Sequence, residues 1–344
     1  MSSFLFWLIL LIILTIIISL ILEQWFNGPK TPLTHSMAGK IIVITGGSRG
    51  IGWEAAKDLL KQGALIIFGN RTIKNTLEKI NTLSEKYKKN CFSYELNLEN
   101  YDSIKNFVST LLKKFNKIDI LINNAASCFI DFTLVNGIEK TFLTNHVGHV
   151  ILTSLLIDNF NDYGRIITVS TTKYRRVWKS TFNKFTDIKN VDFSWTKSVY
   201  EWMRFYIVSK LADIHHAQYL TEIINKKKLK LKSVCLHPGF IDNHFFREIE
   251  KKSYYWSIRD FLQTPFRFCI FKDNVMGAQT HLHLCYMDFE KLKQGGYYRD
   301  CHEEELKEIG TLKYAKKMME FTKEVIVKNN MVKGDTKVMN YFVA

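Results

Sequence analysis

Short apolar runs alternate with longer amphipathic runs along most of the chain after residue 40. This pattern predicts strands at 41–45, 64–69, 92–96, 118–123, 165–170 and 231–237. It predicts helices between them, the first ending near Gln62 and two long ones covering 137–160 and 200–225. Strands that alternate with helices are typical of a parallel sheet covered on both faces. We therefore expect an α/β fold of the Rossmann type, with one doubly wound parallel sheet in a single domain.

The first apolar run differs from these strands in its length. Residues 4–22 are apolar except for Thr15 and Ser19, which is enough to cross a bilayer as a helix. No basic residue precedes the run, whereas a cleaved signal peptide starts with basic residues and ends at a small-residue cleavage site. We predict a retained transmembrane helix at 4–22 within a membrane anchor at 1–27. A linker at 28–38, a globular domain at 39–327 and a C-terminal tail at 328–344 follow.

Basic residues flank only one side of this run. Lys30 and Lys40 follow it and none precedes it, so the positive-inside tendency predicts that the globular domain faces the cytosol. Further along, spaced apolar residues among lysines at 312–327 predict an amphipathic helix. That helix either docks on the domain or contacts a membrane surface.

The first predicted strand runs into a glycine-rich turn, with the sequence KIIVITGGSRGIG at 40–52. Gly46 permits the tight turn, Gly50 lets the backbone approach a pyrophosphate, and Gly52 lets the helix pack on the strand. The N–H groups of such a turn and the start of the helix bind anions. The alternative is a tight turn with a purely structural role. We expect a dinucleotide to contact Gly46, Ser48, Arg49, Gly50, Ile51 and Gly52.

The end of the second strand indicates which dinucleotide is bound. An acidic residue there suits the ribose of NAD, and an arginine suits the 2′-phosphate of NADP. The sequence at 69–71 is Gly-Asn-Arg, and Arg49 adds a second guanidinium nearby. Because arginine binds phosphate in a bidentate fashion, Arg49 and Arg71 favour NADP(H) as the cofactor. The alternative is that both are ordinary surface arginines.

A tyrosine and a lysine, Tyr206 and Lys210, lie four residues apart and so share one face of a predicted helix. A neighbouring ammonium lowers the pKa of a tyrosine, which then exchanges a proton with an alcohol near neutral pH. Tyr101 and Lys105 have the same spacing, but their position away from the ligand-binding edge indicates a solvated helix face. Ser170 ends the fifth strand, at the carboxyl edge of the sheet where ligands bind in such folds.

Charge and cysteine content narrow the choice of partners. The chain has 344 residues and a net charge of +15, which indicates either a lysine-rich surface or attraction to an anionic membrane. The densest basic run, at 225–232, lies where a loop enters a strand, so we predict no nucleic-acid partner. Six cysteines are scattered without the spacing of metal ligands. This usage is typical of a reduced compartment and predicts no metal site.

Taken together, the motifs resemble those of the short-chain dehydrogenase/reductase family, over roughly residues 38–325. The turn at 45–52 is similar to that family's cofactor motif, and 123–126 (N-N-A-A) resembles its N-N-A-G motif. Pro238 and Gly239 resemble its P-G motif after strand six. The residues that match its catalytic tetrad are Asn145, Ser170, Tyr206 and Lys210. The sequences N-H-V-G-H at 145–149 and G-Y-Y-R-D-C at 296–301 resemble its microsomal retinol dehydrogenase branch.

This resemblance implies a role for each residue of the tetrad. Tyr206 is the general acid and base, and Lys210 lowers its pKa and holds the nicotinamide ribose. Ser170 stabilises charge on the substrate oxygen, and Asn145 positions a water molecule for proton relay. The further cofactor contacts that the resemblance implies are Arg71, Asn97, Asn124, Ala125, Tyr206, Lys210, Pro238 and Gly239.

Three residues depart from the family pattern at or near the cofactor. Ala126 replaces the glycine of N-N-A-G, Asn97 replaces an aspartate near the adenine, and Asn243 replaces a threonine after the P-G motif. The segment at 174–200 is also longer than is usual in the family, and it is rich in lysine and aromatic residues. None of these changes removes a residue of the tetrad.

The substrate is inferred from the aromatic segment at 240–271, which follows the P-G motif. Its side chains form local core packing, an apolar substrate pocket, a membrane-contacting face, or the last two together. With the anchor, this favours a lipophilic alcohol and its aldehyde or ketone, most similar to retinol and retinal. We expect the endoplasmic reticulum membrane as the location and leave a homodimer open. The alternatives are a reductase of steroids or other keto-lipids, and a nucleotide-binding scaffold without activity.

Overall fold

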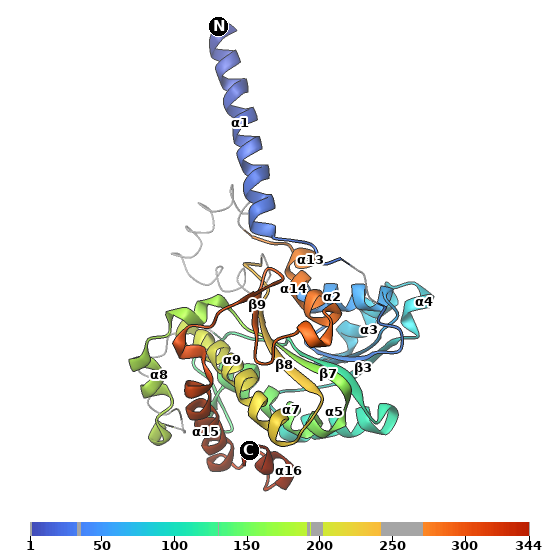
Figure 1. Cartoon of the computed structure of the whole chain (residues 1–344), viewed down its shortest axis with the longest axis vertical. Coiled ribbons are helices and arrows are strands. Elements are labelled where there is room, and N and C mark those ends of the chain that lie inside the picture. The colour runs from blue at the N-terminus through green and yellow to red at the C-terminus, as the bar shows by residue number, and fades with distance from the viewer. Residues whose placement is uncertain are drawn as a thin grey trace.

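A single twisted sheet forms the centre of the protein (Figure 1). The computed structural model describes residues 2–32, 36–129, 131–190, 193, 202–241 and 271–343. The order of the strands is β10-β9-β8-β7-β4-β1-β2-β3, and every neighbouring pair is parallel except β9 and β10. The predicted Rossmann-type α/β fold is therefore confirmed. The strand order reverses direction between β1 and β4, which is where such folds bind ligands.

The strands lie close to their predicted positions. Their bounds are β1 Ile41–Thr45, β2 Leu65–Asn70, β3 Cys91–Glu95, β4 Ile118–Asn123, β7 Phe160–Val169, β8 Leu231–His237, β9 Tyr297–Arg299 and β10 His302–Glu304. β1, β4 and β8 match the prediction at both ends, whereas β7 begins five residues earlier than predicted. The short strands β9 and β10 were not predicted.

Helices cover both faces of the sheet. α2 (Gly50–Lys61) and α14 (Gln279–Tyr286) pack on one face, and α5 (Tyr101–Phe115), α7 (Gly148–Leu156) and α9 (Trp202–Lys226) pack on the other. Successive strand residues point to opposite faces of the sheet. Ile42 and Ile44 therefore belong to the core beneath α2 and α14, and Val43 belongs to the core beneath α5, α7 and α9. The remaining short helices are α3 Ile73–Asn81, α4 Glu85–Lys88, α8 Lys179–Phe185 and α13 Asn274–Gly277.

The helix predicted at 137–160 is wrong in its first part. A hairpin of β5 (Leu134–Val135) and β6 (Ile138–Glu139) precedes α6 (Lys140–Phe142), a π-helix (Leu143–Val147) and α7. The hairpin turns at Asn136 and Gly137, which both have positive φ, as a two-residue Asn-Gly turn requires. Glu139 then caps α6, because its carboxylate accepts the N–H groups of Thr141 and Phe142 at 2.9 and 2.8 Å.

The aromatic segment after Ser170 contributes to the core. In its described part, Tyr174, Phe182, Phe185 and Phe193 are buried. Phe185 lies with its ring centroid 5.2 Å from that of Phe142. These contacts give the additional length of the segment a role in core packing on the α9 side of the sheet.

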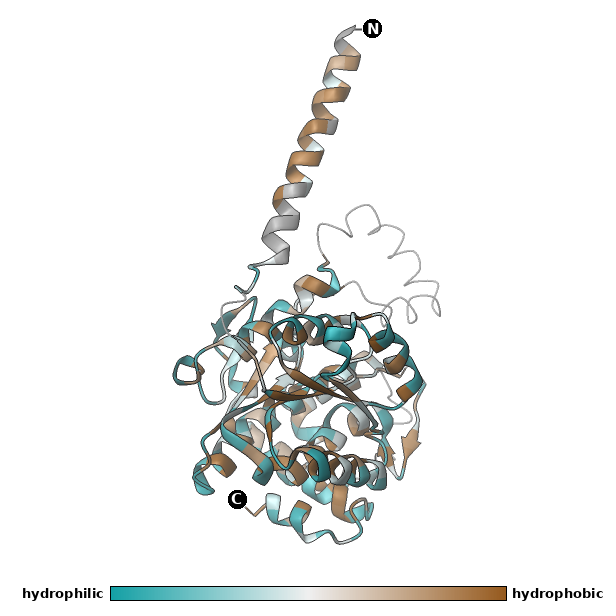
Figure 2. Cartoon of the chain, turned by 90° about the vertical axis from the view of Figure 1, so that its right-hand side faces the viewer, coloured by the Kyte–Doolittle hydropathy of each residue, from teal (hydrophilic) through white to brown (hydrophobic). Residues whose placement is uncertain are grey.

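The first helix, α1 (Ser2–Asn27), projects from the domain (Figure 1). Its described large apolar side chains are exposed, including Phe4 at 74% and Trp7 at 64%, and in Figure 2 the coloured part of the helix ribbon is mostly hydrophobic. Within the part of the chain that the structure describes, no helix is both long and apolar enough to cross a membrane. The transmembrane helix predicted at 4–22 is therefore not supported.

Two helices near the C-terminus pack on the domain. α15 (Leu312–Lys328) buries Met318 and Phe321 in the core that also contains α9, which favours the docked alternative. Beyond it, the tail predicted at 328–344 contains α16 (Thr336–Tyr341), whose Tyr341 hydroxyl lies 2.6 Å from His216 Nε2.

The second Tyr-x-x-x-Lys pair holds this C-terminal segment in place. Tyr101 donates a hydrogen bond of 2.5 Å to Asp335, and Lys105 donates one of 3.2 Å to the same carboxylate oxygen. The pair therefore binds the residue that precedes α16 and has a structural role.

Candidate active site

The glycine turn packs tightly against the segment that follows β4. Gly46 and Gly50 have φ angles of +67° and +61°, in the left-handed region that favours glycine. A Cβ atom on Gly46 would lie 2.8 Å from Ala125 Cα, and one on Gly52 would lie 2.6 Å from Asn124 Nδ2. The glycines at 46 and 52 are thus required for this close approach, whereas a Cβ on Gly50 would meet only Asn274 Oδ1, at 3.7 Å.

A hydrogen-bond chain fixes the segment after β4 to the end of β1. Thr45 Oγ1 accepts the backbone N–H groups of Asn124 and Ala125 at 3.0 and 2.9 Å. His149 Nδ1 lies 2.7 Å from the carbonyl oxygen of Asn145, so this nitrogen carries a hydrogen. Burial lowers the pKa of His149 to about 4, so its ring is neutral and Nε2 accepts from the Thr45 hydroxyl at 2.9 Å.

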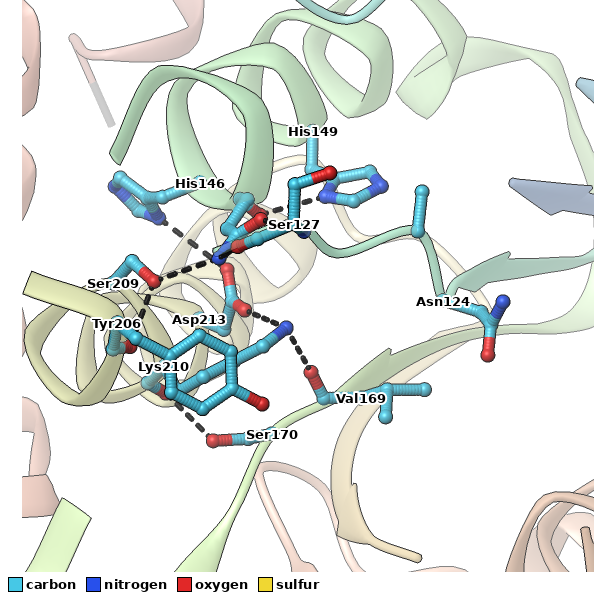
Figure 3. Close-up of polar contacts among 12 residues, drawn as sticks. Asn124, Ser127, His146, His149, Val169, Ser170, Tyr206, Ser209, Lys210 and Asp213 are labelled. Carbon is cyan, nitrogen blue, oxygen red and sulfur yellow. Dashed lines mark hydrogen bonds and ion pairs between the residues drawn. The ribbon is translucent and has the colours of Figure 1, made fainter. Parts of the chain in front are cut away.

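Three residues of the predicted tetrad, Ser170, Tyr206 and Lys210, lie together at the carboxyl edge of the sheet (Figure 3), and Asn145 is connected to them through its hydrogen bond to Ser209. Ser170 directly follows β7, Tyr206 and Lys210 lie on α9, and Asn145 lies in the π-helix. The Ser170 hydroxyl donates to the backbone carbonyl of Lys210 at 2.6 Å. Figure 3 shows the Tyr206 ring beside this bond and in front of the Lys210 side chain.

Asn145 is held rigidly by its side chain. Its Oδ1 accepts the backbone N–H of Ser127 at 2.7 Å, and its Nδ2 donates to the carbonyl of Ser127 at 2.9 Å. The same Nδ2 donates to Ser209 Oγ at 3.0 Å, and Ser209 donates in turn to the Tyr206 carbonyl. The side chain of Asn145 therefore ties the π-helix both to the loop after β4 and to α9.

The Lys210 ammonium forms a buried ion pair. It donates to the Val169 carbonyl and to Asp213 Oδ2, both at 2.9 Å, and the two side chains are 3% and 2% exposed. Asp213 Oδ1 lies 3.8 Å from His146 Nδ1, and His146 is fully buried. An ammonium has three N–H donors, so with respect to the described residues one remains for a ligand.

The pKa of Tyr206 differs from the sequence prediction. Burial raises the pKa of Tyr206, and the neighbouring Cys128 and Asp213 raise it further. The expectation that Lys210 lowers this pKa is therefore not met in this structure. The main physical reason is burial, and the charge of Asp213, which is paired with Lys210, adds to it.

The other predicted cofactor contacts surround the glycine turn. Ser48 is half-buried and Arg49 is exposed at the start of α2. Ile51 faces α13, where a Cβ on Gly277 would lie 2.7 Å from Ile51 Cγ2. Pro238 is buried after β8. The backbone φ of Gly239, at +96°, again favours glycine.

Arg71 and Asn97 lie at the ends of neighbouring strands, and both approach Glu99. Arg71 is exposed and its Nη1 lies 3.8 Å from Glu99 Oε1. Asn97 Oδ1 accepts the backbone N–H of Glu99 at 3.1 Å. Among the residues that depart from the family pattern, Ala126 is exposed. Asn243 and most of the aromatic segment at 240–271 lie outside the described residues.

Buried polar atoms around the turn fit a dinucleotide. Within the described residues, Asn124 Oδ1 and Asn274 Oδ1 are buried without a hydrogen-bond partner. Both side chains adjoin glycines of the turn. Ribose hydroxyls can satisfy such acceptors, and the glycines of the turn let a pyrophosphate approach the backbone. The residues present therefore fit a nicotinamide dinucleotide.

The structure adds residues that the sequence reasoning missed. Asp213, His149 and Ser209 each contact a member of the tetrad, and Asn274 adjoins the glycine turn. The spacing of Asp213, three residues after Lys210 on a helix, was a sequence signal for an ion pair. Asn274 offered no such signal, because it approaches the turn from a distant part of the chain.

The C-terminal G-x-Y-x-x-D-C sequence contacts the linker after α1. Thr31 Oγ1 lies 3.4 Å from Cys301 Sγ and donates to the Gln279 carbonyl at 2.8 Å. Lys272, directly after Phe271, pairs with Asp300 at 2.5 Å. A Cβ on Gly28 would lie 3.3 Å from Lys272 Nζ. This sequence therefore fixes the residues directly after α1 beside Lys272.

Comparisons with known proteins identify the family. The family described as short chain dehydrogenase matches residues 40–181. Mouse retinol dehydrogenase 14 is 30% identical over 302 residues, which cover 82% of this chain and 85% of that protein. The short-chain dehydrogenase TIC 32 A of Brassica napus chloroplasts is 28% identical and covers 78% of this chain and 83% of its own length.

The fold is also similar to that of solved structures. L-sorbose reductase from Gluconobacter frateurii, solved with NADPH and L-sorbose, superposes with a TM-score of 0.59 at 21% identity, over 77% of this chain and 95% of that one. With the shared sequence over most of its length, the chain belongs to the short-chain dehydrogenase/reductase family, in its retinol dehydrogenase-like branch.

Proposed function

We propose that the protein is an NADP(H)-dependent oxidoreductase that interconverts a lipophilic alcohol and its aldehyde or ketone. One observation carries this proposal. The Ser170 hydroxyl, the Tyr206 phenol and the Lys210 ammonium adjoin one another at the carboxyl edge of the sheet, which is also the edge where β1 enters the glycine turn. A hydroxyl pair and a cation in this place suit proton transfer to or from a substrate oxygen.

The residues divide the work of a carbonyl reduction. Tyr206 gives its proton to the carbonyl oxygen, and Ser170 stabilises the charge that develops on that oxygen. To do so, the Ser170 hydroxyl exchanges its bond with the Lys210 carbonyl for one with the substrate. The free N–H of Lys210 orients the nicotinamide ribose, and Asn145 keeps α9 in register with the loop after β4. When bound, NADPH supplies the hydride.

The choice of NADP(H) rests on charge near the adenosine ribose. β2 ends at Asn70, Arg71 follows directly, and neither residue is acidic. Arg49 adds a second exposed guanidinium at the start of α2. The contact between Arg71 and Glu99 is long, at 3.8 Å, so a 2′-phosphate can compete for the guanidinium.

The choice of a lipophilic substrate rests on α1 and its attachment. Exposed apolar side chains on a projecting helix indicate contact with lipid or with another protein. The base of this helix lies beside Lys272, whose side chain also adjoins Gly239 of the P-G motif, so the helix is attached close to the predicted cofactor site. Several related proteins are retinol dehydrogenases by name. We propose retinal or retinol at the endoplasmic reticulum surface, with the domain in the cytosol.

The test uses the full chain in mild detergent with all-trans-retinal and either NADPH or NADH, followed by cofactor absorbance. We expect oxidation of NADPH, and its loss in Tyr206→Phe. Tyr101→Phe is the matched control, because that residue belongs to the other Tyr-x-x-x-Lys pair and binds Asp335. The control should keep its activity.

Two other outcomes would redirect the proposal. NADPH binding without turnover of retinal, but with turnover of a steroid ketone or another keto-lipid, would keep the site and replace the substrate. NADPH binding without turnover of any carbonyl compound would favour a nucleotide-binding scaffold. Equal activity of the wild type and Tyr206→Phe would refute the assigned acid.

A further inference from the structure

The buried pair of Lys210 and Asp213 bears on how Tyr206 holds its proton. Both side chains are almost fully buried, and the ammonium lies 2.9 Å from Asp213 Oδ2. Lys210 also lies one turn after Tyr206 on α9, on the same face. An unpaired ammonium in this place would favour the phenolate form of Tyr206. The Asp213 carboxylate, paired with the Lys210 ammonium, compensates this positive charge.

The groups that face Asp213 from other elements do not supply a second positive charge beside Lys210. His146 faces the Asp213 carboxylate from the π-helix. His149 on α7 and Cys235 on β8 interact electrostatically with the same carboxylate. Burial lowers the pKa of both histidines and raises that of Cys235, so all three are neutral near pH 7. Within the described part of the chain, Lys210 is the one cation in contact with Asp213.

His146 has a defined tautomer that supports this assignment. Thr322 donates its own hydroxyl hydrogen to the Met318 carbonyl at 2.8 Å. His146 Nε2, at 2.9 Å from Thr322 Oγ1, must therefore be the donor in that pair. A neutral ring then has no hydrogen on Nδ1, the atom that faces Asp213. The negative charge of Asp213 is consequently balanced by Lys210 and not by His146.

On the side of Tyr206, the facing titratable groups in the described part of the chain include Cys128 and Asp213. Cys128 lies in the loop after β4, and burial raises the pKa of its thiol to about 12, so it is neutral near pH 7. We propose that Asp213 is a positioning residue that compensates the charge of Lys210 and so keeps Tyr206 in the phenol form. This inference rests on the proposed function, in which Tyr206 transfers the proton.

The consequence is a pH range for each direction of the reaction. Near neutral pH, Tyr206 carries the proton that reduction requires. The carbonyl carbon gains a hydride from NADPH, the Tyr206 O–H bond breaks, and the new O–H bond of the alcohol forms. The tyrosinate then takes up a proton from water. Alcohol oxidation requires tyrosinate at the start and is confined to alkaline solution. The overall equilibrium is unchanged, because an enzyme alters only the rates.

The experiment follows the protonation of Tyr206 directly and without turnover. The full chain, labelled with ¹³Cζ-tyrosine, is titrated in detergent with NADP⁺ bound, and Tyr206→Phe identifies the resonance. In the wild type we expect the phenol signal to persist above pH 9. In Asp213→Asn, which removes the charge and keeps the shape, we expect the midpoint to fall by about one pH unit or more. Asp213→Glu, which keeps the charge, should stay close to the wild type.

Each outcome decides the inference. A wild-type midpoint below pH 8 would overturn it, even if Asp213→Asn does not fold. Equal midpoints in the wild type and a folded Asp213→Asn would overturn it as well. Because this readout needs no substrate, absence of turnover would refute the proposed function without touching the inference. Where turnover is found, the alkaline limb of alcohol oxidation should move with the NMR midpoint in each variant.

Discussion

Gly148 lies where α7 crosses the segment after β3, and it has no room for a side chain. A Cβ atom there would lie 2.3 Å from the carbonyl oxygen of Leu98 and 2.7 Å from Leu98 Cβ. Ordinary contacts begin about 1 Å further out, and both sides of this contact are backbone, which cannot rotate away. Replacement of Gly148 by alanine therefore has to separate α7 from Leu98, which follows Asn97.

Two opposing effects set the size of the change. Alanine is favoured over glycine inside a helix by about 0.5–1 kcal/mol. Overpacking of a tight core costs about 1–3 kcal/mol, and a backbone contact belongs at the upper end of that range. We expect Gly148→Ala to lower the free energy of unfolding by about 2 kcal/mol. With an unfolding entropy of about 0.7 kcal/mol/K for a chain of 344 residues, the Tm falls by about 3 °C.

The assay is thermal unfolding by circular dichroism, together with NADPH binding by fluorescence. Gly310→Ala is the matched control, because the nearest atoms to its Cβ would belong to the side chains of Leu306, Tyr174 and Ile214, at 3.2, 3.3 and 3.6 Å. Those side chains can move, so the control should change the Tm by less than about 1 °C. We also expect Gly148→Ala to weaken NADPH binding several-fold. A Tm equal to or above that of the wild type would refute the steric reasoning.

Three further predictions follow from contacts described above. Thr45→Val leaves the N–H groups of Asn124 and Ala125 without their acceptor, and should cost about 2–3 kcal/mol in chemical denaturation, while Thr45→Ser stays near the wild type. Arg71→Ala should raise the KM for NADPH tenfold or more and leave that for NADH unchanged; equal effects on both would contradict a 2′-phosphate contact. Burial raises the pKa of Asp335 and its bonds from Tyr101 and Lys105 lower it, with a net shift below the ordinary value. Because the folded pKa is depressed, Asp335 stabilises the fold above about pH 4 and ceases to do so as the pH falls through the folded pKa. Asp335→Asn should therefore cost about 1–2 kcal/mol at pH 7, and its difference from the wild type should disappear in acid.

The sheet and its ligand-binding edge were predictable from the sequence because apolar runs mark buried parallel strands clearly. β1 is a run of this kind, β4 and β8 are apolar runs interrupted by Asp119 and by Lys232 and Ser233, and each strand leads into a recognisable motif. β9 and β10 are too short to give a periodic signal. Each has three residues, and β10 contains only His and Glu.

The break in the helix predicted at 137–160 was hidden by a continuous apolar pattern. Asn136 and Gly137 form a strong hairpin signal, which the apolar pattern outweighed. The π-helix at Leu143–Val147 has no sequence signature of its own, because it arises from tertiary contacts of Asn145 and His149. Propensity cannot report such contacts.

The proximity of the four residues of the predicted tetrad was predictable, but their electrostatics were not. Sequence spacing places Tyr206 and Lys210 on one helical face. It does not reveal that Asp213 is buried with the lysine, nor that burial raises the pKa of Tyr206. Both facts depend on elements that close over α9 from elsewhere in the chain, including α15 and the π-helix.

The placement of α1 and α16 at opposite ends of the molecule determines how reporter proteins should be attached (Figure 1). α16 is fixed to the domain by the contact of Tyr341 with His216 and by a bond from Lys337 to the Leu155 carbonyl at 2.7 Å. A fluorescent protein joined after α16 would stand on the far side of the domain from α1. Energy transfer from such a reporter to dyes in a vesicle would be weak if α1 enters the lipid. Strong transfer would show that the opposite face touches it.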